Sequence, residues 1–292
     1  MKNSEITDIP FREAVEAIDS GNVSALQQLL AADASLAVRR LDKPEQGYFA
    51  HPYLLWFVAD NPIRHEKLPP NIVDVAEVII GALKKSGDGN YSFIVGYTMG
   101  LVCTGRIPKE CKVQIPLMEL LVENGAAVKG SVLGSIGQHN FEAARWLLDK
   151  GAKYDLATAV GLDDVEGARR LAKDATPSEL YVALVVAAFF GKAGMIALLI
   201  AAGADVNGSG SKEDFGGFHS HASALHQAVY SGSLESVRLL VEAGASLTAT
   251  DRAYQGTPLG WSMYMQEEEA DGEEEKKKFA EIERYLRNRN AK

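Results

Sequence analysis

The sequence is short of cysteine and of excess positive charge, and each shortage excludes a class of protein. Its 292 residues include two cysteines, Cys103 and Cys111. Two cysteines form no disulfide framework and suit a reducing compartment. Lys and Arg number 30 against 39 Asp and Glu, for a net charge of −9. Nucleic-acid binding needs a basic stripe, so no nucleic-acid partner is expected. The first ten residues lack the apolar core of a signal peptide, which favours a cytoplasmic protein.

Uninterrupted apolar segments are also scarce. The strongest, residues 180–204, carries a single charge, Lys192, and is long enough to span a bilayer. However, its middle contains Gly191-Lys192-Ala193-Gly194, which is typical of a turn. The segment therefore predicts two short buried helices that form a hairpin, and no membrane partner is expected.

Catalytic motifs are missing as well. The sequence has no phosphate-binding Walker motif, no nucleophile elbow and no HExxH zinc motif. A nucleophilic Cys103 would need a base, and His139 is the only candidate within about one repeat. The paired carboxylates Asp163 and Asp164 precede a helical pattern, so they are expected to cap that helix. The chain is therefore predicted not to be an enzyme and to use no cofactor.

What the sequence does contain is a repeat, clearest in residues 222–245. It opens with Ser223-Ala-Leu-His226, turns at Gly232 and closes with Gly244-Ala245. This stretch resembles one ankyrin repeat, whose pattern is T-P-L-H-x-A-A-x-x-G-H, a second helix, and then L-L-x-x-G-A. In that family the histidine usually bonds to the backbone of the neighbouring finger, which is the role expected for His226.

The closing Gly-Ala pairs measure the repeat along the chain. They begin at residues 125, 151, 203 and 244, in steps of 26, 52 and 41. The step of 52 is twice 26, which indicates a degenerate unit between. Units of 26 have room for two helices but not for the family's β-hairpin finger. The resemblance thus implies an all-α ankyrin-like solenoid of about eight helix-turn-helix units, several without fingers, as a single domain over residues 1–292.

The same resemblance implies a function. Ankyrin-like proteins are mostly binding modules without catalytic activity, although fold alone is weak evidence for function. We therefore expect a protein-protein interaction module (a scaffold, adaptor or inhibitor) that binds an unidentified partner protein on its concave face. A solenoid whose last helix is highly charged closes its own end, so a monomer is expected.

The variable positions of the last units are unusually aromatic, and aromatic residues and Met are enriched at interface cores. Two readings stay open: these side chains line a groove, or the finger folds over them and buries them. The predicted partner-binding residues are Phe189, Phe190, Phe215, Phe218, His219, His221, Tyr230, Tyr264 and Met265.

The alternative function is a small-molecule- or metal-binding regulator that uses the finger loop, residues 205–221. In this loop His219 and His221 would lie on one side of an extended segment, with Asp205 and Asp214 upstream. A stable metal site needs a third and a fourth ligand held rigidly, and the glycine-rich loop argues against such rigidity. No metal is therefore predicted.

Overall fold

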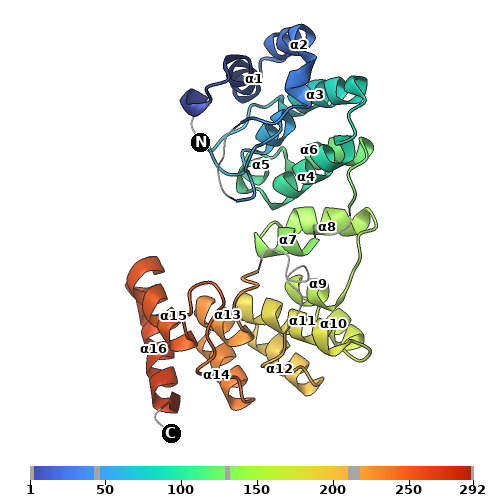
Figure 1. Cartoon of the computed structure of the whole chain (residues 1–292). Helices are drawn as coiled ribbons and strands as arrows, with labels where there is room; N and C mark the ends of the chain where they lie inside the picture. Colours follow the sequence, from blue (N-terminus) through green and yellow to red (C-terminus); the bar gives the residue numbers. More distant parts are fainter. Residues whose placement is uncertain (1–2, 43–46, 129–131, 210–217, 291–292) are drawn as a thin grey trace. The chain divides into compact units, whose positions relative to one another are not determined.

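The protein consists of paired helices (Figure 1). The computed structural model describes residues 3–42, 47–128, 132–209 and 218–290. Within these ranges no β-strand forms, and only an isolated antiparallel bridge joins Arg40 to Tyr53. The described helices pair in chain order as eight hairpins, which confirms the predicted all-α fold of about eight units. Residues 1–152 and 153–292 form two compact units, and each is described by itself.

The first unit contains four hairpins. In each hairpin the first helix packs against the second, and first helices also contact first helices of the next hairpin. The pairs are α1 (Ile9–Ser20) with α2 (Val23–Ala32), η3 (Leu54–Ala59) with α3 (Ile72–Ser86), α4 (Tyr91–Thr104) with α6 (Gln114–Glu123), and α7 (Val132–Gly137) with α8 (Phe141–Asp149). Short η2 (Ala34–Ala37) and α5 (Arg106–Glu110) lie in the connections, and short η1 (Asn3–Glu5) precedes α1.

Element η3 departs from the repeat. It is a 3-10 helix of six residues, all of them buried. Trp56 and Phe57 stand where the family has two small residues, and their rings need more room than alanines do. Phe57 packs edge-on against Phe11 at 5.9 Å, and Trp56 stacks on Tyr97 at 4.1 Å between centroids. These bulky contacts accompany a short, tight helix in place of a regular α-helix.

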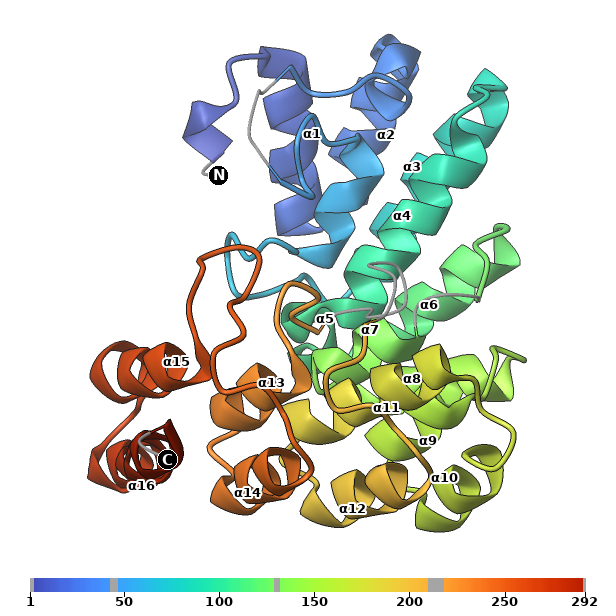
Figure 2. The same cartoon turned by 60° about the horizontal axis from the view of Figure 1, so that its bottom comes forward.

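The second unit repeats the arrangement with four more hairpins (Figure 2). Helices α9, α11, α13 and α15 contact one another in succession, and so do α12, α14 and α16. The pairs are α9 (Leu156–Gly161) with α10 (Val165–Leu171), α11 (Pro177–Phe189) with α12 (Ala193–Ala201), α13 (Ala224–Tyr230) with α14 (Leu234–Glu242), and α15 (Pro258–Tyr264) with α16 (Glu273–Asn290). A π-helical turn, η5 (Met265–Glu269), follows α15.

The apolar segment 180–204 forms the α11–α12 hairpin, as predicted. Every residue from Leu180 to Ala188 in α11 is buried. Thr176 and Glu179 start the helix with a reciprocal capping box. In the described part of the chain, no helix is both long and apolar enough to cross a membrane.

The closing glycines explain the regular spacing of the units. Gly244 ends its hairpin with φ of 92°, and Gly125, Gly151 and Gly203 have φ between 91° and 94°. The Ala245 N–H then donates to the Leu240 carbonyl at 2.9 Å, which satisfies an otherwise free carbonyl of the helix end. Glycine adopts this left-handed conformation without the steric cost of a Cβ, so it marks the end of each of these units.

Candidate functional site

Aromatic and imidazole rings of the second unit form one connected group, here called the ring cluster. At one end, the Phe189 ring stacks on Tyr230 with centroids 5.3 Å apart and an interplanar angle of 23°. The same ring contacts Phe218 edge-on at 5.0 Å and Phe190 at 5.1 Å. Aromatic rings at these separations and angles stabilise a fold by more than the burial of their surface alone. The cluster comprises Phe189, Phe190, Phe218, His219, His221, Tyr230, Tyr254 and Trp261.

Two histidines continue the cluster toward the last hairpin. His219 lies edge-on to Tyr230 at 4.8 Å and 5.6 Å from the His221 ring. His221 in turn contacts Tyr254 at 5.7 Å and Trp261 at 6.0 Å. The cluster therefore joins α11, α13 and α15 through the segment 218–222, here called the histidine loop.

The cluster has a buried side and an exposed side. Phe218 is only 5% exposed, and its ring contacts those of Phe189 and Phe190. Tyr230 is 37% exposed, Tyr264 is 55% exposed and Tyr254 is 80% exposed. Phe189, Phe190, His219, His221 and Met265 are half-buried. Phe215 lies outside the described residues. Some of the predicted residues are therefore covered, and others lie at the surface.

Tyr264 stands at the end of α15, beside the acidic turn η5. Its hydroxyl donates a hydrogen bond to the Glu269 carboxylate at 3.2 Å. This hydrogen bond and the charge of Glu269 raise the pKa of Tyr264, and the nearby Glu268 and Tyr254 add to the effect. The phenol is therefore held neutral, next to carboxylates at the protein surface.

Asp251 builds the loop that presents Tyr254. Its side chain is fully buried, and its two oxygens accept four hydrogen bonds. The donors are the backbone N–H groups of Ala253, Tyr254 and Gly256, at 2.7 to 2.9 Å, and the Trp261 indole N–H, at 3.0 Å. Burial by itself raises the pKa of Asp251, but these donors outweigh it and lower the pKa to about 2.

His226 has the backbone role expected from the repeat. Its Nε2 lies 3.0 Å from the carbonyl oxygen of Gly256, in the loop before α15. Its Nδ1 accepts from the Ser223 N–H at 3.3 Å. His226 is fully buried, and its ring packs 5.1 Å from Trp261. Burial lowers the pKa of His226 despite opposing contributions from Gly256 and Asp251, so the imidazole is a neutral structural link.

These repeats can now be compared with known proteins. Residues 114–251 match the model of a family described as ankyrin repeats in three copies. The chain contains ankyrin repeats. Among solved structures it is similar to the human ASB11 ankyrin repeat domain, with 15% identity and a TM-score of 0.39, over 92% of this chain and 96% of that one. No curated protein sequence matches the chain. Ankyrin repeats are generally protein-interaction modules and are typically non-catalytic.

In this ankyrin-repeat protein the described residues do not assemble a metal site. No group of three or more His, Cys, Asp or Glu side chains that the structure describes is arranged to hold a metal ion. Asp205 uses its carboxylate to accept the N–H of Asn207 at 2.9 Å, which closes a local turn. Asp214 lies outside the described residues. His219 and His221 instead pack against rings.

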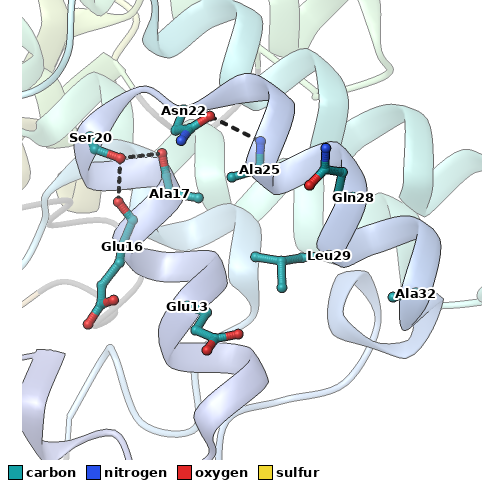
Figure 3. A pocket seen from close by; sticks show the side chains of 9 residues that line it. All are labelled: Glu13, Glu16, Ala17, Ser20, Asn22, Ala25, Gln28, Leu29 and Ala32. Atoms are coloured by element: carbon teal, nitrogen blue, oxygen red, sulfur yellow. Dashed lines mark hydrogen bonds between the residues drawn. The ribbon is translucent and has the colours of Figure 1, made fainter.

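Two surface depressions of the ankyrin-repeat protein lie away from the ring cluster. One of about 530 Å³ lies between α1 and α2 (Figure 3). Its polar side chains serve local structure, because Ser20 donates to the Glu16 carbonyl and Asn22 accepts from the Ala25 N–H. The other, of about 520 Å³, lies between α10 and α12, where Lys192 donates to two carbonyls at the end of α9.

A buried charged group lies in the first unit. The side chains of Arg64 and Asp60 are each 1% exposed, and their charged groups are 3.6 Å apart. The Arg64 guanidinium also binds Asp19 at 2.7 Å and covers the Phe57 ring at 4.9 Å. Asp60 accepts the backbone N–H groups of Arg64 and Glu66, at 3.0 and 3.1 Å. This group holds the long connection between η3 and α3.

Sequence reasoning missed three residues of the site: Asp251, Tyr254 and Trp261. The repeat register gives the two variable positions after the first helix, and none of these residues occupies them. A signal was nevertheless present, because residues 251–256 directly precede Thr257-Pro258-Leu259, the clearest opening motif in the chain. That placement makes them the finger of the last unit, where an aspartate beside turn residues often organises a loop.

Proposed function

We propose that the chain is a protein-binding module whose partner contacts the exposed side of the ring cluster. One observation carries this proposal: Tyr230 of α13 and Tyr254 of the loop before α15 are exposed on either side of the two histidine rings, and Tyr264, at the end of α15, is exposed near Tyr254. Exposed aromatic groups with a supporting layer are the usual anchors of protein interfaces. We place the surface on the concave face, as the positions of Tyr230 and Tyr264 in the repeat imply.

Contacts within the protein reduce the entropy that these tyrosines lose when a partner binds. An exposed side chain that is already held in place loses little conformational freedom when a partner covers it. Tyr230 is stacked on Phe189, and Tyr264 is tied to Glu269. Tyrosine also offers an apolar ring together with a hydroxyl, so it contacts both apolar and polar groups of a partner. The role is that of a scaffold, adaptor or inhibitor, without catalysis.

The cysteines fit a cytoplasmic location, which we include in the proposal. Cys103 and Cys111 form no disulfide with the described residues. Cys103 is buried inside α4, where a small apolar side chain is suitable, and Cys111 accepts the Leu68 N–H at 3.4 Å. Free thiols in packing roles persist in a reducing compartment.

The double substitution Tyr230→Ala/Tyr264→Ala tests the proposed surface. We expect it to weaken binding of the natural partner at least about tenfold, because truncating an aromatic anchor typically costs more than about 1 kcal/mol. The partner is first identified by affinity capture with the wild-type chain and mass spectrometry. Its affinity for each variant is then measured by calorimetry with purified proteins.

Tyr48→Ala is the matched control for this experiment. Tyr48 is 56% exposed, against 55% for Tyr264, and its hydroxyl donates to Asn61 as that of Tyr264 donates to Glu269. It lies in the first unit, so the control should bind the partner like the wild type. Equal losses in the control and the double variant, or no loss in either, would show that the ring cluster is not the binding surface.

A further inference from the structure

Three buried polar atoms without a bonding partner lie together at the histidine loop. They are Nε2 of His219, Nε2 of His221 and Oε1 of Gln227, and none has a hydrogen-bond partner in the described part of the protein. Gln227 is fully buried, and its amide donates to the carbonyl of His219 at 2.9 Å. Each such group typically costs about 1–3 kcal/mol, so two of them on the histidine loop and a third on the adjoining α13 point to a function rather than to packing alone.

The groups around the His219 imidazole are mainly aromatic rings. From α11 the loop meets the Phe189 ring, and from α15 it meets the Trp261 indole, which donates to Asp251. From α13 it meets the phenol of Tyr230, 4.8 Å from the His219 ring. None of these neighbours is a free carboxylate that would balance a charge on an imidazolium.

The loop before α15 adds charged groups, and they do not favour protonation either. The Arg252 backbone N–H donates to the His221 carbonyl at 2.8 Å, and the Arg252 guanidinium binds the Ser220 carbonyl. A permanent cation therefore lies against the histidine loop. Asp251 interacts with His226, but both of its oxygens are occupied by four N–H donors. The Tyr254 phenol contacts His221 through its ring. A proton on His219 therefore adds a second cation, and none of the described groups named above is a free carboxylate that would accept a bond from it.

We propose that His219 forms an acid-sensitive latch, in which its protonation releases the histidine loop and dismantles the partner-binding face of the ring cluster. This proposal rests on the proposed function for its consequence, the release of the partner in acid. Opening the loop withdraws Phe218 from Phe189 and Phe190, whose rings lie 5.0 and 5.9 Å from it. Phe189, on which Tyr230 stacks, then loses its contact with Phe218.

The direction of the pH effect follows from burial. Burial, aided by the neighbouring His221, lowers the pKa of His219 below its ordinary value of 6.5. The open loop therefore takes up protons before the closed loop does. The closed state keeps its full stability above pH 6.5 and loses it as the pH falls below that value. The contribution of Asp251, whose pKa is lowered from 3.8 to about 2, persists throughout this window and is lost only as the pH falls below about 4.

Hydrogen exchange of the full chain measures the latch directly. Its two reporters are the Ala222 amide, bonded to the His219 carbonyl at 3.0 Å, and the Arg252 amide, bonded to the His221 carbonyl. We expect their protection factors to fall at least about tenfold between pH 7.5 and pH 5.0. In His219→Phe, which keeps a ring and removes the protonation site, the amides should stay protected at pH 5.0.

The exposed His139 provides the control, because His139→Gln should retain the acid response of the wild type. If the phenylalanine variant is already unprotected at pH 7.5, His219→Gln replaces it. Acid-insensitive protection in the wild type, or acid-sensitive protection in the variant without His219, would overturn the latch. The readout needs no partner, so the latch and the binding surface fail separately.

Discussion

Asp251→Ala is expected to lower the unfolding free energy of residues 153–292 by about 3–4 kcal/mol. The substitution leaves four N–H donors, including the Trp261 indole, without an acceptor in a fully buried site. The same loop supplies the Gly256 carbonyl that His226 binds, so the contact between the last two hairpins weakens as well. Hydrogen exchange measured by mass spectrometry reports this loss separately for each unit.

Two further substitutions show whether the buried bonds are the cause. Asp251→Asn keeps one carbonyl oxygen but turns an NH₂ group toward N–H donors, so an intermediate loss is expected. Asp205→Ala removes an exposed aspartate of the same unit that accepts a single N–H, and it should cost less than about 1 kcal/mol. A similar loss for Asp205→Ala and Asp251→Ala would contradict the account of Asp251.

Arg64→Ala is expected to have a comparable effect on residues 1–152, a loss of about 3–5 kcal/mol. The arginine is the cation between Asp60 and Asp19, and its removal leaves the buried Asp60 carboxylate without a charged partner. Uncompensated buried charge is among the most destabilising changes known in proteins. The same exchange experiment, applied to peptides from 1–152, measures the loss.

Arg106→Ala is the natural comparison for Arg64→Ala. Arg106 also pairs with two carboxylates, those of Glu110 and Glu66, but its side chain is 51% exposed. Exposed ion pairs contribute little to stability because water screens them, so this variant should be nearly as stable as the wild type. If Arg64→Ala proved equally mild, the Arg64 group would not hold the η3–α3 connection.

Much of the fold was predictable because the sequence of each repeat contains residues that start and end its helices. The Gly-Ala pairs mark the ends of second helices, since glycine alone takes the left-handed conformation there at no steric cost. Asp164 caps α10 by accepting the Gly167 N–H at 2.8 Å, as its position before a helical pattern predicts. His226 was likewise identified by its place in the opening motif. Each of these features acts within a few residues of its own position or on the adjacent unit.

The irregular parts were not predictable in the same way. The second hairpin begins with the short η3 because Trp56 and Phe57 occupy positions that suit small residues. The connection to α3 depends on Arg64 meeting Asp19, a residue 45 positions earlier. Contacts between such distant residues produce no repeating pattern in the sequence from which they could be predicted.

The sequence by itself determined the repeating helical hairpins, their number and the position of the aromatic residues along them. It did so because caps, turns and apolar spacing are local properties of the chain. Only the tertiary structure decided which rings are covered and which are exposed. Phe218 is buried because the histidine loop is tied to Arg252 and Gln227, and Tyr254 is at the surface because Asp251 organises the loop before α15. Such a fold depends on bonds between distant residues, and spacing along the chain does not encode them.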